Sequence, residues 1–316
     1  MFDWHNLSAV LPADWHPAVL ASDSSVLGQI QELRIRCGQP VLAYGQFGEM
    51  FLTEQGLSPC SQRWLVAGRE HVQHILATIS RSSLYALGEE LRSGYLTIQG
   101  GHRIGLVGRA VVEQGRVKTL KYITGFNVRL AREVKGCSTP LLPILQDGRT
   151  TIYSTLVVSP PQAGKTTLLR DLARALSSGD RPLQRAHKVV VVDERSELGA
   201  CWQGMPQLDL GPRCDVLDAC PKAEGMMMAL RALSPEVLVT DEIGRWEDAA
   251  AIEEALNCGV TVIASAHGAS LEDLTRRPGL RRLLQDVSFE RFIVLSSRRG
   301  PGTVEAVLDE RRHSLL

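Results

Sequence analysis

The pattern of apolar and polar positions changes character near the middle of this 316-residue chain. In residues 31–42 and 95–112 apolar and polar side chains alternate, which is the period of half-buried strands. Between them, residues 69–91 repeat apolar side chains at a helical spacing. Gly100-Gly101 predicts a hairpin turn inside the second alternating stretch. Together these patterns predict a small α+β domain.

The second half of the chain contains short runs of branched apolar residues with helical stretches between them. The runs cover residues 155–158, 189–192, 237–240 and 260–264. Such runs, separated by helices, are typical of a parallel sheet that helices cover on both faces. We therefore predict an α/β domain at residues 136–316, preceded by an N-terminal α+β domain at residues 1–135.

The composition gives no sign of a nucleic-acid-binding protein held by overall charge, or of a membrane-spanning or secreted protein. The 35 basic residues balance the 35 acidic ones, so the chain has no global attraction to nucleic acid or anionic lipid. No apolar run reaches the length of a membrane span, and the N-terminus lacks a basic start followed by an apolar core. We expect a cytoplasmic protein without a transmembrane segment of its own.

A phosphate-binding loop follows the first apolar run. Its sequence nearly matches the pattern Gly-x-x-x-x-Gly-Lys-Ser/Thr between a strand and a helix, in which backbone N–H groups surround nucleotide phosphates. Lys165 would reach the β- and γ-phosphates, and Thr166 would place its hydroxyl on Mg²⁺. Ser159 replaces the usual first glycine, which leaves slow turnover open. The expected ATP-binding residues are Ser159, Pro160, Pro161, Gln162, Ala163, Gly164, Lys165, Thr166 and Thr167.

Acidic residues and a histidine follow the other runs, at the edge where open α/β sheets bind ligands. We expect Asp241 to hold Mg²⁺ and Glu242 to orient the attacking water. Glu194, which ends another run, is a candidate second base. His267 is a candidate sensor of the γ-phosphate. Besides Lys165, this domain supplies no obvious second cation fixed against the γ-phosphate, although Arg245, just past the acidic pair, is a candidate for that role within the same subunit.

These segments resemble the secretion ATPases of type II and type IV systems and, over the whole chain, the family of the stage III sporulation protein AA. Residues 241–249 resemble the second acidic box of the secretion ATPases, and residues 264–267 their histidine box. The whole-chain likeness is carried by residues 33–36, 100–106, 126–133, 159–167, 192–197 and 241–245. The resemblance implies a RecA-like P-loop ATPase core. It also implies that Glu194 belongs to an acidic box and that Arg103 lies on a strand that presents arginines to the nucleotide. Arg109, Arg129 and Arg132 are weaker candidates for that role.

The resemblance further implies a homo-oligomeric ring, expected to be a hexamer, that energises a channel between mother cell and forespore. Its partners would be membrane proteins of that channel, through which it would be peripheral at the membrane. Two alternatives stay open, namely a motor that translocates nucleic acid and a slow, nucleotide-gated scaffold. Neutral overall charge argues against the first, so we do not expect nucleic acid as a partner.

Overall fold

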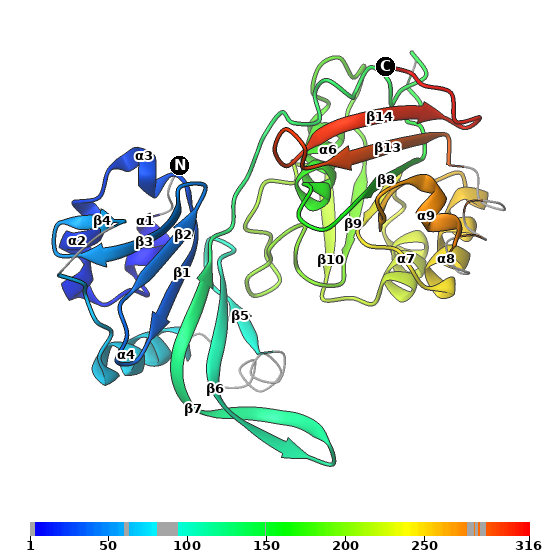
Figure 1. Cartoon of the computed structure of the whole chain (residues 1–316). Coiled ribbons are helices and arrows are strands. Elements are labelled where there is room, and N and C mark those ends of the chain that lie inside the picture. The colour runs from blue at the N-terminus through cyan, green and yellow to red at the C-terminus, as the bar shows by residue number, and fades with distance from the viewer. Residues whose placement is uncertain are drawn as a thin grey trace. The chain divides into compact units, whose positions relative to one another are not determined.

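The computed structural model describes residues 4–59, 63–80, 94–148, 150–276, 281, 284 and 289–316. The chain divides into two compact units, residues 1–132 and residues 133–316. Figure 1 labels many of the elements of both units. Within the described parts, no helix is both long and apolar enough to cross a membrane.

The first unit is built on a seven-stranded antiparallel sheet with the strand order β4-β3-β2-β1-β7-β6-β5. Its strands are β1 (Ile30–Arg36), β2 (Leu42–Gly45), β3 (Gly48–Thr53), β4 (Gly56–Ser58), β5 (Tyr95–Thr97), β6 (Arg103–Glu113) and β7 (Arg116–Arg129). Its helices are α1 (Trp4–Ser8), the 3₁₀ helix η1 (Ala13–Trp15), α2 (His16–Leu20), α3 (Ser24–Leu27) and α4 (Arg69–Ser80).

Alternation along β1 determines which face of this sheet is buried. Leu33 and Ile35 join a hydrophobic core with residues of the N-terminal helices and of α4, whereas Arg34 and Arg36 stay half exposed. The predicted half-buried strand is therefore confirmed, and so is the hairpin turn at Gly100-Gly101 between β5 and β6. The helix predicted over residues 69–91 extends to Ser80 as α4, and its expected continuation lies outside the described residues.

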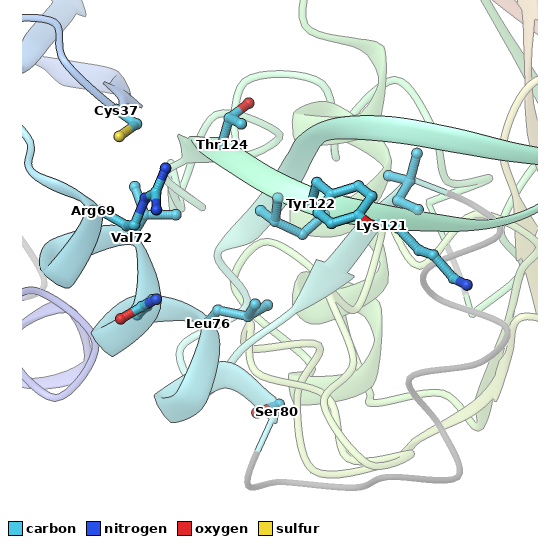
Figure 2. A pocket seen from close by; sticks show the side chains of 11 residues that line it. Cys37, Arg69, Val72, Leu76, Ser80, Lys121, Tyr122 and Thr124 are labelled. Carbon is cyan, nitrogen blue, oxygen red and sulfur yellow. The ribbon is translucent and has the colours of Figure 1, made fainter.

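A groove of about 790 Å³ lies within this unit, between α4 and the middle of β7 (Figure 2). Val72 and Leu76 line it from α4, and Leu120 and Tyr122 line it from β7. The groove is lined by none of the residues that the sequence predicts to bind nucleotide.

The second unit carries a seven-stranded sheet with the order β10-β9-β11-β12-β8-β13-β14. All its pairings are parallel except β13 with β14. Its strands are β8 (Thr155–Ser159), β9 (Val189–Asp193), β10 (Cys214–Asp218), β11 (Val237–Thr240), β12 (Thr261–His267), β13 (Arg291–Ser296) and β14 (Thr303–Asp309). Its helices are α6 (Lys165–Ser178), α7 (Lys222–Ala232), α8 (Trp246–Asn257) and α9 (Leu271–Thr275).

Helices cover both faces of this sheet, as the branched apolar runs predict. One hydrophobic cluster joins alternate residues of the central strands to α6, and a second joins the other residues to α7, α8 and α9. Each central strand is therefore buried on both faces. The carboxyl ends of β8, β9, β11 and β12 all lie at one edge, because these strands are parallel neighbours.

Candidate functional site

The loop that the sequence predicts to bind phosphate connects β8 to α6, between a strand and a helix as expected. Gly164 is the N-cap residue of α6, and its φ of 94° is left-handed. An added Cβ at Gly164 would lie 2.9 Å from the backbone nitrogen of Gly302, in the turn between β13 and β14. The Gly302 N–H also donates to the Ala163 carbonyl at 2.9 Å. Conformation and contact therefore both require glycine at position 164.

Ser159 is the last residue of β8 and is fully buried. It is not among the described residues with positive φ, so serine fits this position without backbone strain. The loop instead places Gln162, with φ of 59°, and Gly164 in the left-handed region. The departure from the usual first glycine is therefore conformationally neutral in this chain.

Lys165 begins α6 and is buried. Its Nζ donates to the carbonyl oxygens of Ser159 and Pro160 at 3.2 and 3.3 Å. Burial lowers the pKa of this ammonium, while the nearby carboxylates of Glu242, Asp241 and Glu197 act to raise it. The Lys165 ammonium thus interacts electrostatically with the acidic residues that follow β9 and β11.

Asp241, directly after β11, is the least satisfied carboxylate of this edge. It is fully buried, and neither of its oxygens has a hydrogen-bond partner in the part of the chain that the structure describes. Burial, and then the charge of Asp193, raises its pKa from 3.8 to about 7, while Lys222 acts to lower it. A buried carboxylate without a partner is costly unless a cation compensates it. Its two free oxygens therefore fit a hard divalent cation such as Mg²⁺.

Glu242 follows Asp241 with φ of 44°, which is uncommon for a residue with a side chain. Its N–H donates to the Ser265 hydroxyl at 3.0 Å, and the next N–H, of Ile243, donates to the Ser265 carbonyl at 2.8 Å. β12 therefore fixes the backbone of Glu242. The Glu242 carboxylate accepts from the Arg195 guanidinium, with 2.6 Å between Nη1 and Oε2.

The end of β9 divides its acids between two roles. Asp193 is fully buried and accepts hydrogen bonds from the backbone N–H groups of Glu197, Leu198 and Gly199, at 2.8 to 2.9 Å. Its pKa is nevertheless raised, because burial is the largest influence on it. Asp193 therefore shapes the loop, whereas the Glu194 side chain forms an ion pair with Lys222 at the start of α7.

His267 ends β12 and lies in register with Ser159 of β8. The following N–H, of Gly268, donates to the Ser159 carbonyl at 3.1 Å. The structure thus brings the predicted histidine beside the first residue of the phosphate loop. The half-buried side chain of Thr166 lies one residue after Lys165, at the start of α6.

Arg103, by contrast, belongs to the first unit. It begins β6, stacks over the ring of Tyr95 at 4.8 Å and lies directly opposite Arg129 of β7. Of the weaker candidates, Arg109 lies opposite Lys121, and Arg132 donates to the Ile30 carbonyl. All of these arginines belong to the first unit, and their roles stay predictions.

Sequence reasoning missed two cations of the site. Arg245 is the N-cap residue of α8 and is exposed, whereas Arg195 and Lys222 form ion pairs with Glu242 and Glu194. Neither Arg195 nor Lys222 is among the residues that the sequence predicts for the site. The Asp-Glu-Arg sequence at residues 193–195 gave a signal for Arg195. Lys222 gave none, because β10 separates it from that segment.

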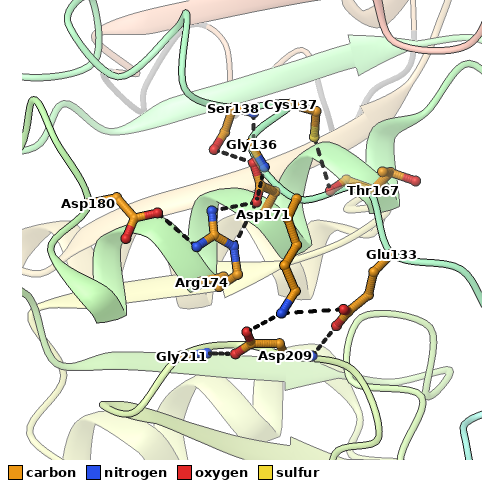
Figure 3. Close-up of polar contacts among 11 residues, drawn as sticks. Glu133, Gly136, Cys137, Ser138, Thr167, Asp171, Arg174, Asp180, Asp209 and Gly211 are labelled. Carbon is orange, nitrogen blue, oxygen red and sulfur yellow. Dashed lines mark hydrogen bonds and ion pairs between the residues drawn. The ribbon is translucent and has the colours of Figure 1, made fainter. Parts of the chain in front are cut away.

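A polar network fixes the beginning of the second unit to the phosphate-loop helix (Figure 3). Asp171 of α6 accepts from the backbone N–H groups of Gly136 and Ser138 and from the Ser138 hydroxyl, at 3.0, 2.8 and 2.7 Å. Burial acts to raise the pKa of Asp171, but the bonds from Ser138 and Gly136 and from Arg174 leave it lowered. The segment that enters this unit is thereby attached to the helix that starts at Lys165.

This fold is that of the RecA-like secretion ATPases. The chain is similar to the pilus retraction motor PilT with bound ADP, at a TM-score of 0.55 and 13% identity, over 84% of this chain and 74% of that one. It is also similar to the ATPase DotB of Legionella pneumophila, at a TM-score of 0.51 and 17% identity, over 84% and 72% of the two chains.

Within that class the family follows from the sequence. The family described as "Sporulation stage III, protein AA" matches residues 7–315. The stage III sporulation protein AA of Bacillus subtilis (strain 168) is 45% identical over 306 residues, covering 97% of this chain and 95% of that protein. The chain therefore belongs to the stage III sporulation protein AA family.

Proposed function

We propose that this protein is a Mg²⁺-dependent ATPase whose site lies at the carboxyl edge of the second sheet. The observation that carries the proposal is the pairing of the predicted phosphate loop with Asp241, a buried carboxylate whose two oxygens have no partner among the described residues. A divalent cation held by Asp241 and Thr166 would compensate this charge and neutralise the phosphates. Similarity to the ATPase DotB and the motor PilT supports the same fold for the site.

The residues of the chain divide the remaining work. Backbone N–H groups of residues 162–167 cradle the phosphates, and Lys165 exchanges its two carbonyl acceptors for phosphate oxygens. Glu242 orients the attacking water, with Glu194 as a second acid. His267 contacts the γ-phosphate from the end of β12.

Two variants test these roles. Lys165→Ala should lose nucleotide binding and turnover together, because it removes the cation of the loop. Glu242→Gln should keep ATP bound and stall hydrolysis, because only the carboxylate that orients water is lost. Radiolabelled ATP retained on a filter measures nucleotide binding, and phosphate release measures hydrolysis. If Glu242→Gln turns over like the wild type, the assignment passes to Glu194.

We further propose that residues 1–135 and 136–316 act as two domains of a homo-oligomeric ring, a hexamer, in which Arg103 completes the site of a neighbouring subunit. An arginine inserted at the γ-phosphate raises the rate of phosphoryl transfer roughly 10³- to 10⁵-fold. Mixing Arg103→Ala with Lys165→Ala subunits tests the arrangement. Partial return of activity supports action in trans, whereas no mixture recovers if Arg103 serves its own subunit.

The ring would energise a channel complex between mother cell and forespore, as membership of a sporulation family suggests. We propose that it is cytoplasmic and reaches the membrane through the membrane proteins of that complex. Washing sporulating-cell membranes with high salt should then release it. If only detergent extracts it, this attachment is wrong.

A further inference from the structure

The structure pairs the candidate base of the site with a cation from the adjacent strand end. Arg195, two residues after β9, donates from Nη1 to Oε2 of Glu242, two residues after β11. We propose that Arg195 is a latch that responds to the γ-phosphate, exchanging the Glu242 carboxylate for the γ-phosphate when ATP binds. The inference rests on the proposed ATPase function and adds a residue that distinguishes ATP from ADP within one subunit.

The Arg195–Glu242 pair can exchange partners, because it is exposed. The side chains of Arg195 and Glu242 are 56% and 34% exposed. Exposed ion pairs contribute little to stability, so another anion can displace one partner at small cost. The other pair of this edge is different, because the side chain of Lys222 is only 6% exposed where it meets Glu194. Breaking a buried pair leaves an uncompensated charge, so Lys222 is a fixed cation and Arg195 an exchangeable one.

The position of the pair suits a phosphate held by the loop. β9 and β11 are parallel neighbours, and only β12 lies between β11 and β8, which leads into the loop. β11 therefore lies two strand spacings from β8, roughly 10 Å, and β9, which Arg195 follows, lies three, roughly 14 Å. The carboxylate that Arg195 holds therefore lies at the same edge of the sheet as the loop that contains Lys165.

The chemistry of the exchange follows from the guanidinium group. Its rigid fork of N–H donors matches a carboxylate and a phosphate equally well in geometry. The γ-phosphate carries the larger negative charge, so it competes for Arg195, whereas ADP offers no such group. When Arg195 leaves, the Glu242 carboxylate becomes free to accept from water. Its backbone stays fixed meanwhile by the bond to Ser265. Binding of the γ-phosphate and release of the base thus become one event.

The test compares the affinities of a non-hydrolysable ATP analogue and of ADP, each with Mg²⁺, by calorimetric titration. Arg195→Gln should weaken the analogue about 10- to 100-fold, the range for a lost charge-assisted hydrogen bond. It should change ADP binding less than about twofold. Arg195→Lys keeps the charge but not the forked donors, so its affinity for the analogue should lie between those of the wild type and Arg195→Gln. The matched control is Arg185→Gln, because Arg185 pairs with Glu236 at 2.9 Å, with 43% and 34% exposure, before β11 begins. It should leave both affinities unchanged.

Each result decides the inference. If Arg195→Gln weakens the analogue and ADP equally, or weakens neither, the latch is wrong. If Arg195→Gln does not fold, as thermal unfolding would show, Arg195→Lys carries the test, and an unchanged ratio of the two affinities overturns the latch. A wild-type protein that binds neither nucleotide contradicts the proposed ATPase function itself. A wild type that binds the analogue tightly while Arg195→Gln keeps its preference contradicts the latch alone.

Discussion

Replacing Asp241 by asparagine should stabilise the folded protein while abolishing its activity. Asp241 is fully buried, and its two oxygens have no partner in the described part of the chain. Without a bound cation, folding must therefore bury an uncompensated negative charge. Asparagine has nearly the same shape and no charge, so the variant removes that cost. The same change removes the only carboxylate that we assign to Mg²⁺, so hydrolysis should fall to background.

The pKa of Asp241 gives the magnitude and its pH dependence. Burial raises this pKa from 3.8 to about 7, a difference worth about 4 kcal/mol at 1.36 kcal/mol per unit. Because the pKa in the folded state lies above the unfolded value, ionisation of Asp241 costs folding free energy. The cost is absent below about pH 4, grows as the pH rises and is complete above about pH 7. Asparagine leaves its own amide group buried, so we expect a net gain of about 2 kcal/mol at pH 8.

Urea unfolding in EDTA measures this gain. The free energy of unfolding of Asp241→Asn should exceed that of the wild type by about 2 kcal/mol at pH 8, and the difference should shrink toward zero near pH 5. The control is Asp215→Asn, at an exposed carboxylate on β10, which should change stability by less than about 0.5 kcal/mol at either pH. A variant that is less stable than the wild type at pH 8 would refute the view of Asp241 as an uncompensated buried charge.

Two further substitutions probe how the site is held. Gly164→Ala should lower the free energy of unfolding in urea by about 2 kcal/mol and abolish ATP binding. The reason is that a left-handed φ and a contact at 2.9 Å with Gly302 both oppose a side chain. Unchanged ATP binding would contradict the view that the contact with Gly302 holds the loop in its conformation. Asp171→Asn should lower the free energy of unfolding by about 3 kcal/mol, because the hydrogen bonds from Gly136 and Ser138 lose their charged acceptor. A loss below about 1 kcal/mol, close to that of Asp215→Asn, would show that these hydrogen bonds contribute little to stability.

The sequence identifies the strands of the second sheet that carry the phosphate loop and the acids. Each of these strands is buried on both faces, so an uninterrupted branched apolar run marks it. The other strands escape this reasoning. β10 is only half buried, and β13 and β14 lie at the end of the sheet, where their pattern is mixed. In the first unit, β7 pairs with β1 across many residues of sequence, so no local pattern predicts that pairing.

The same distinction holds within the site. Lys165, Asp241 and His267 are predictable because each begins, ends or directly follows an element with a strong pattern. Ion pairs such as Arg195 with Glu242 and Lys222 with Glu194 join residues that are distant in sequence, so only the parallel order of the strands brings them together. The contact of Gly302 with the phosphate loop has the same origin, because β13 lies beside β8.

Phosphate release from ATP by the wild-type protein, with Mg²⁺ and then with EDTA, tests the central claim most directly. The account predicts steady release with Mg²⁺ that EDTA abolishes and that fresh Mg²⁺ restores. It also predicts that Lys165→Ala, measured in the same preparation and at the same concentration, shows only background release. Release by the wild type that equals that of Lys165→Ala with Mg²⁺ present, or that persists in EDTA, would contradict the assignment of a Mg²⁺-dependent ATPase.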